Sequence, residues 1–175
     1  MKVTRIIFFA LSAIIALSIL TTGCSKSNNN NSSSTSISAT VGSSSYSSST
    51  YAAGIYSTDS SYFGLLGMQV VNKDTTFFTL DFSGPVVLNQ QITTATNANS
   101  FLTVGYQPNG AFGNYYGASY YDFGQGSAIV TVTSYDSTGH KIAGTFSGVL
   151  YNELNSSDSV IVTNGKFSTN FTVIP

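Results

Sequence analysis

The sequence has few of the residues on which much protein chemistry depends, with one cysteine, one histidine and no tryptophan. The single cysteine, Cys24, excludes an intrachain disulfide and leaves no second thiol for a cysteine-based metal site. Charged residues make up 7% of the chain, against roughly 25% in ordinary soluble domains. After residue 23 the chain has four lysines, no arginine and seven acids, so it lacks the clustered cations that bind nucleic acid. We therefore expect no nucleic-acid partner.

The first 23 residues have the pattern of a secretory signal peptide. A short basic start with Lys2 and Arg5 precedes an apolar run of 15 residues, Ile6–Leu20. A membrane-spanning helix needs about 20 apolar residues, whereas the apolar part of a signal peptide needs only about 7 to 15. The length therefore predicts an export signal over residues 1–23 rather than a permanent span.

The end of this segment, Leu20-Thr21-Thr22-Gly23-Cys24-Ser25, places small side chains before a cysteine. It resembles the lipobox of bacterial lipoproteins, with Thr21 in place of the usual large apolar residue. The resemblance implies that the Cys24 thiol takes a diacylglycerol, that the chain is cut before Cys24, and that the new amino group is acylated, with palmitate for example. We expect Cys24 to be the lipidation site, with the membrane as a partner through that lipid.

Residues 24–36, which begin with the lipidated cysteine, are rich in Ser and Asn and show no apolar periodicity, a composition that predicts a flexible tether. An acidic run after the lipidated cysteine, which marks surface export in some Bacteroidetes-type lipoproteins, is absent. We therefore expect a lipid-anchored protein of the cell envelope, on the outer membrane and facing the periplasm.

Residues 37–175 are predicted to form one all-β domain. Ser, Thr, Val, Tyr, Phe and Gly dominate, and no stretch shows the spacing of an amphipathic helix. Short strands between turn residues predict a single antiparallel β-sandwich or an open barrel. The predicted strands cover residues 37–41, 51–56, 62–71, 75–82, 100–106, 127–135, 142–150, 160–163 and 166–173.

Three turn signals join these strands into hairpins. Asn72-Lys73-Asp74 and Asp136-Ser137-Thr138-Gly139 each separate two alternating runs. The third signal, Asn164-Gly165, has the composition that a two-residue type I′ turn requires, because both central residues need positive φ. It predicts a hairpin between residues 160–163 and 166–173.

The C-terminal third carries a family resemblance. The segments Ile142-Ala143-Gly144-Thr145-Phe146-Ser147-Gly148 and Val162-Thr163-Asn164-Gly165-Lys166-Phe167-Ser168 are similar to the end of small uncharacterised lipoproteins from Bacteroidetes-type bacteria. In that family a strand with Gly-Thr-Phe-Ser precedes one that closes on Thr-Asn-Gly-x-Phe. The resemblance implies a β fold and a location in the envelope, and it brings no mechanism.

The most unusual stretch is the Tyr- and Gly-rich segment 106–123. Flat aromatic faces beside amides suit sugars, and tyrosine also suits protein contacts because it is large with little side-chain entropy to lose. One interpretation is therefore a carbohydrate- or protein-binding module. The other is a loop with half-buried tyrosines over a core that has no tryptophan. The candidate binding residues are Tyr106, Tyr115, Tyr116, Tyr120 and Tyr121.

Little in the sequence indicates catalysis. Asp81, Asp122 and Asp136 are isolated in sequence, although a hydrolase of the glycosidase type needs only two carboxylates. The lone histidine, His140, follows a turn, and Glu153 with Asp158 lacks the alternating pattern of a calcium loop. We expect a non-catalytic structural or accessory protein with no metal and no cofactor, and with a glycan or an envelope protein as a further partner.

The binding interpretation generates a direct prediction. Soluble Ser25–Pro175 should bind glycans or peptidoglycan fragments in a screen, and replacing Tyr115, Tyr116, Tyr120 and Tyr121 by alanine should abolish that binding in a variant that still folds. Absence of binding by the parent would remove the sugar interpretation for the ligands tested.

Overall fold

Strands make up most of the part of the chain that the structure describes. The computed structural model describes residues 35–48, 51–59, 61–94, 101–110, 114–119 and 126–175, which belong to one unit of the chain. The elements are β1 Ser36–Val41, β2 Ser44–Ser47, β3 Tyr51–Ser57, β4 Tyr62–Val71, β5 Asp74–Ser83, β6 Gln91–Thr93, β7 Leu102–Gln107, the 3₁₀ turn η2 Pro108–Gly110, β8 Tyr116–Ser119, β9 Ser127–Asp136, β10 Lys141–Asn152 and β11 Ser159–Ile174.

Hydrogen-bonded pairing runs through all of these strands. Their order is β2-β1-β11-β3-β4-β5-β7-β8-β10-β9-β6, and β10 also pairs with β11. The pairings from β11 through β3, β4, β5, β7 and β8 to β10 therefore return to β11. Every pairing is antiparallel except that of β3 with β11, which is parallel. The all-β prediction is confirmed.

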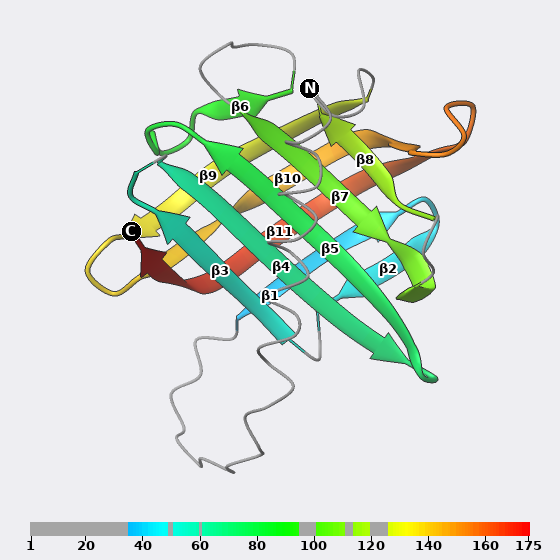
Figure 1. The fold of residues 1–175 in the computed structure, drawn as a ribbon, viewed down its shortest axis with the longest axis horizontal. Helices are drawn as coiled ribbons and strands as arrows, with labels where there is room; N and C mark the ends of the chain where they lie inside the picture. Colours follow the sequence, from blue (N-terminus) through cyan, green and yellow to red (C-terminus); the bar gives the residue numbers. More distant parts are fainter. Residues whose placement is uncertain (1–34, 49–50, 60, 95–100, 111–113, 120–125) are drawn as a thin grey trace. The chain divides into compact units, whose positions relative to one another are not determined.

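The strands lie in two layers that cross each other (Figure 1). One layer contains β3, β4, β5, β7 and β8, and the other is built around β9, β10 and β11. Aromatic rings join the layers, because Phe78 of β5 lies 5.0 Å from Phe146 of β10, and Phe63 of β4 lies 5.5 Å from Phe171 of β11. These rings belong to the buried core, which is the burial that offsets the entropy cost of ordering the chain.

The long strand β11 connects the two layers by its pairings. One of its edges pairs with β10 over most of its length. Its other edge pairs first with β1 and then, from Phe171 to Ile174, with β3. Because β1 and β3 share one edge of the same strand, β11 belongs to both layers.

The hairpin predicted at Asn164-Gly165 is wrong, because residues 160–163 and 166–173 lie in one continuous strand. Pairing passes from Phe146 with Gly165 to Gly148 with Val162, so β11 holds one residue more than β10 over this stretch. The register with β1 shifts at the same place. Asn164 has φ +53°, which places a β-bulge there. Asn-Gly favours positive φ, and a bulge requires positive φ as much as a tight turn does.

Other predicted hairpins are confirmed. Asn72 and Lys73, with φ of 52° and 74°, form the two-residue turn between β4 and β5. Asp136 closes the turn between β9 and β10, where its Oδ1 accepts hydrogen bonds from the backbone N–H groups of Thr138 and Gly139 at 3.0 and 2.8 Å. Three strands were not predicted: β2, β6 and β8. Each is four residues or fewer, too short for an alternating pattern to stand out.

The predicted signal peptide, Cys24 and almost all of the predicted tether lie outside the described residues. Within the described ranges, no helix has the length and apolar character needed to cross a membrane.

Replacing Gly165 by alanine should test the bulge. The new Cβ would clash with the Phe146 carbonyl oxygen and lie 2.7 Å from Cδ2 of the same residue. Overpacking of this kind costs about 1–3 kcal/mol, so the free energy of unfolding in urea should fall by that amount.

The matched control is Asn164→Gly, which keeps a residue that tolerates positive φ and should change the stability by only a few tenths of a kcal/mol, on the order of other exposed substitutions. Equal stability of Gly165→Ala and the parent would contradict the proposed packing.

Candidate functional site

Three of the five candidate tyrosines lie among the described residues. Tyr106 lies on β7, Tyr115 immediately precedes β8, and Tyr116 begins β8. Tyr106 and Tyr116 are adjacent across the β7–β8 pairing. Tyr120 and Tyr121 lie outside the described residues, so the binding prediction for the full set stays a prediction.

Tyr106 packs against the core. Its ring centroid lies 5.6 Å from that of Phe78, 6.3 Å from Tyr116 and 6.5 Å from Tyr46. Burial raises the pKa of Tyr106, and the neighbouring Tyr116 hydroxyl raises it further. Packing of this kind is what a core without tryptophan requires.

Tyr115 lies over the other side of β7. Gly105 leaves the space for it, because a Cβ at Gly105 would clash with the Tyr115 hydroxyl. The Tyr115 ring therefore covers backbone that would otherwise be exposed, and its side chain is itself partly buried.

Tyr116 anchors the loop between β10 and β11. Its hydroxyl donates a hydrogen bond to Asp158 Oδ2 at 2.7 Å, and this bond, followed by burial, raises the Tyr116 pKa. Asn152 Nδ2 donates to the same oxygen at 3.4 Å, and Asn152 Oδ1 accepts from the backbone N–H of Leu154 at 2.9 Å. Asp158 therefore helps to close a loop, and we find it engaged in structural bonds.

The other candidate acid–base groups are separated from one another. Asp81 accepts a hydrogen bond from the Tyr62 hydroxyl at 2.5 Å across β4 and β5, whereas Asp136 closes the β9–β10 turn. His140 is exposed at the end of that turn, with its ring 5.4 Å from Phe171. Asp122 lies outside the described residues. Among those that are described, no three His, Cys, Asp or Glu residues gather in a way that could hold a metal ion.

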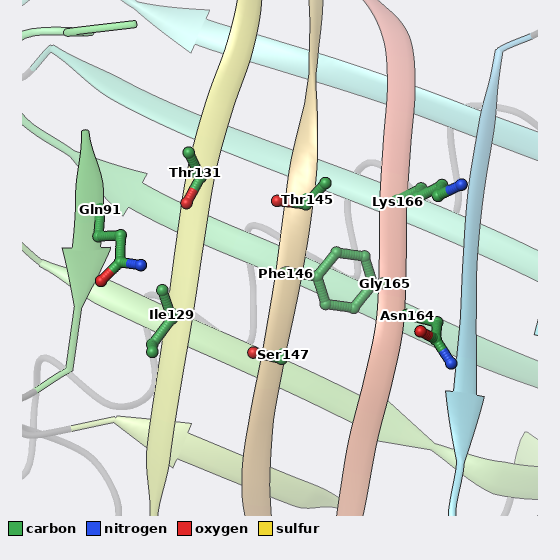
Figure 2. Close-up of a pocket in the computed structure, with 9 residues that line it drawn as sticks. All are labelled: Gln91, Ile129, Thr131, Thr145, Phe146, Ser147, Asn164, Gly165 and Lys166. Atoms are coloured by element: carbon green, nitrogen blue, oxygen red, sulfur yellow. The ribbon is translucent and has the colours of Figure 1, made fainter. Parts of the chain in front are cut away.

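A shallow depression lies on the outer side of the layer that contains β9, β10 and β11 (Figure 2). Its volume is about 370 Å³. Figure 2 shows Gln91 on β6 at one side and Asn164 and Lys166 on β11 at the other, with β9 and β10 between them. The lining residues are Gln91, Ile129, Thr131, Thr145, Phe146, Ser147, Asn164, Gly165 and Lys166.

The side chains of this lining supply hydroxyls, amides, one ammonium group and the exposed apolar side chain of Ile129. Thr131, Thr145 and Ser147 project from the central strands because alternate residues of a strand face the same side. Lys166 provides the one cation among the lining residues, and no carboxylate is among them. Such a surface can bind polar groups, and it provides no pair of groups for acid–base catalysis.

This depression was not predicted from the sequence. Its residues come from four strands, and the hydroxyl residues among them are the common outward positions of any β-sheet. The one available signal was Asn164-Gly165, which was interpreted as a turn.

Comparison with known proteins is consistent with an uncharacterised domain. The chain is similar over residues 118–170 to a family described as "Domain of unknown function (DUF5025)". That match spans every lining residue of the depression except Gln91. No curated protein and no solved structure matches the chain.

Removing the Tyr116 hydroxyl should test its structural role. Tyr116→Phe should lower the free energy of unfolding by about 1 kcal/mol, the usual net contribution of such a hydrogen bond. The pKa of Tyr116 is raised above its ordinary value of 10.0 in the folded state. Its stabilising contribution is therefore full below pH 10.0 and is lost as the pH rises through the folded-state pKa, so the difference between variant and parent should shrink there.

Urea unfolding at neutral pH and above pH 10.0 measures both effects. The control is Tyr151→Phe, on the neighbouring strand, whose hydroxyl has no hydrogen-bond partner in the described ranges. A Tyr116→Phe variant as stable as the parent at neutral pH would show that the bond to Asp158 contributes nothing.

Proposed function

We propose that this protein is a lipid-anchored, non-catalytic β-domain protein of the bacterial cell envelope, with a structural or accessory role. The observation that carries the non-catalytic part is the placement of the carboxylates. Asp81, Asp136 and Asp158 each accept hydrogen bonds that join strands or close loops. A carboxylate held in this way is a structural acceptor, whereas a general acid or base must be able to reach a substrate proton.

The tethered location is supported by the N-terminal sequence. An apolar run of signal-peptide length precedes the single cysteine, and a Ser- and Asn-rich stretch follows it. Two or three acyl chains on Cys24 would bind a bilayer stably, since each buried methylene contributes about 0.8 kcal/mol. The tether would keep the β domain near the membrane and leave it free to reorient.

The accessory role is supported by the chemistry of the surface. The outward positions of β9 and β10 include several hydroxyl side chains, and the depression across them is lined by neutral polar groups, one cation and the exposed Ile129. A surface of this kind forms hydrogen bonds without proton transfer. It suits a protein that holds or recognises another envelope component rather than one that converts it.

The lipid anchor can be tested by labelling. The full-length chain with a C-terminal epitope tag is produced in a bacterium that is fed a clickable palmitate analogue, and the tagged protein is isolated. The parent should carry the label and Cys24→Ala should carry none, because the thiol and the amino group that take the acyl chains belong to Cys24.

Ser25→Ala is the control and should keep the label. An unlabelled parent, in cells whose own lipoproteins are labelled, would refute the anchor. Protease treatment of the same cells then reports the orientation, since a protein that faces the periplasm is protected until the outer membrane is permeabilised.

A further inference from the structure

The polar side chains around the depression are free to bind a ligand. Within the described part of the chain, the side chains of Gln91, Asn164 and Lys166 form no hydrogen bond or ion pair with the protein, although all three line one concave surface. Asp81, Asp136 and Asp158 differ in this respect, because their carboxylates are used by the fold. Ligand sites usually combine a concave apolar surface with a few polar groups that fix the orientation of the ligand.

The bulge in β11 places two of these groups. Asn164 occupies the extra position of the bulge with φ +53°, a conformation that costs roughly 1 kcal/mol for a residue other than glycine. Bulges redirect side chains and are frequent beside functional sites. Figure 2 shows Asn164 and Lys166 together at the β11 end of the lining, with their side chains on the side of β11 that faces β1.

The floor of the depression is partly apolar. Gly165 has no side chain on this surface, and the Phe146 ring beside it faces the core and is only 3% exposed. On the opposite side Ile129 is 36% exposed. An exposed apolar side chain among amides and hydroxyls matches a sugar, which offers C–H groups on its ring faces and hydroxyls at its edges.

The length of the depression and the charge of its lining further restrict the class of ligand that it could bind. Strands lie about 4.8 Å apart, so β6 and β11, three spacings apart, are separated by roughly 14 Å. This length exceeds one sugar ring and suits a short oligosaccharide. Lys166, the one cation in the lining, can pair with one carboxylate, whereas a polyanion such as nucleic acid needs several cations.

We propose that this depression binds an oligosaccharide that carries a carboxylate. The Lys166 ammonium pairs with the carboxylate, Asn164 and Gln91 bind hydroxyls through their amides, and the Ile129 side chain contacts the C–H face. The inference names a ligand for the accessory role proposed above and rests on it. It places the site on β6, β9, β10 and β11, apart from the Tyr- and Gly-rich segment.

The test uses the full-length chain purified in detergent from a whole-cell lysate, with isothermal titration calorimetry as the measurement. The probes are tri-galacturonate and its fully methyl-esterified form, which differ only in the charged groups. The parent should bind tri-galacturonate about tenfold more tightly than the ester, the effect of one charge-assisted hydrogen bond.

The variants separate the roles of the residues. Lys166→Ala should weaken tri-galacturonate binding by about tenfold and leave the ester unchanged. Asn164→Gly keeps the backbone conformation and should weaken both probes by a similar factor, because it removes only the amide. Lys141→Ala is the matched control, since Lys141 is an exposed lysine of β10 outside the hollow, and it should bind as the parent does.

Two outcomes would overturn the proposal. One is a folded parent that binds neither probe at millimolar concentration, and the other is a Lys166→Ala variant that binds tri-galacturonate as tightly as the parent. Both differ from failure of the proposed anchor, which appears as the loss of palmitate label and has no effect on calorimetry in detergent. Loss of binding in the tyrosine variant with Lys166→Ala unaffected would assign the sugar site to segment 106–123 instead.

Discussion

Strand β11 pairs with three other strands, and the connection between the two layers of the fold depends on these pairings. Its edges pair with β10, β1 and β3, so one strand joins the two layers through backbone hydrogen bonds, with a shift of register at the bulge. A regular strand of 16 residues would be too straight to follow both layers, because the layers cross. The extra residue at Asn164 bends the strand and increases its twist. Asn164 also lines the outer depression, so the bulge that bends β11 also places a residue of the candidate site.

The core shows how a domain without tryptophan fills the space between crossing layers. Phenylalanines from the two layers meet at centroid distances of 5.0 and 5.5 Å, and tyrosines such as Tyr135, 5.8 Å from Phe171, pack around them. The hydroxyl of Tyr46 is buried without a hydrogen-bond partner in the described part of the chain, and burial raises its pKa. Tyrosines thus serve here as large apolar residues. The free-energy cost of burying a hydroxyl is uncompensated at Tyr46, whereas a hydrogen bond to Asp158 compensates it at Tyr116.

Much of the strand pattern could be predicted from alternation, because one face of each long strand packs against the core. The turns at Asn72-Lys73 and Asp136 follow from local chemistry, which is independent of the rest of the fold. Asn164-Gly165 shows the limit of such reasoning. Positive φ is a local property, but whether the chain reverses or only bulges there depends on whether neighbouring strands continue past it. That depends on β1 and β10, which no local pattern specifies.

The candidate site was harder to predict than the fold for a related reason. Gln91 and Lys166 are 75 positions apart in the sequence, and only the pairing of β6 with β9, then β10, then β11 brings them to one surface. Tyr106 and Tyr116 stood out by composition, yet the fold uses both to pack against the core. Composition identifies unusual residues, whereas a binding surface is defined by which residues remain unengaged after folding.

The strands at the two ends of the pairing order, β2 and β6, have four and three residues. An end strand offers unpaired N–H and C=O groups to which another copy of the chain could add. Most proteins discourage such addition with charged side chains, but only 7% of this chain is charged. Short end strands also discourage such addition, because a strand from another copy could form only a few hydrogen bonds with them. Under the lipid anchoring proposed above, many copies on one membrane would meet often, and a short edge would then matter more than it does for a freely diffusing protein.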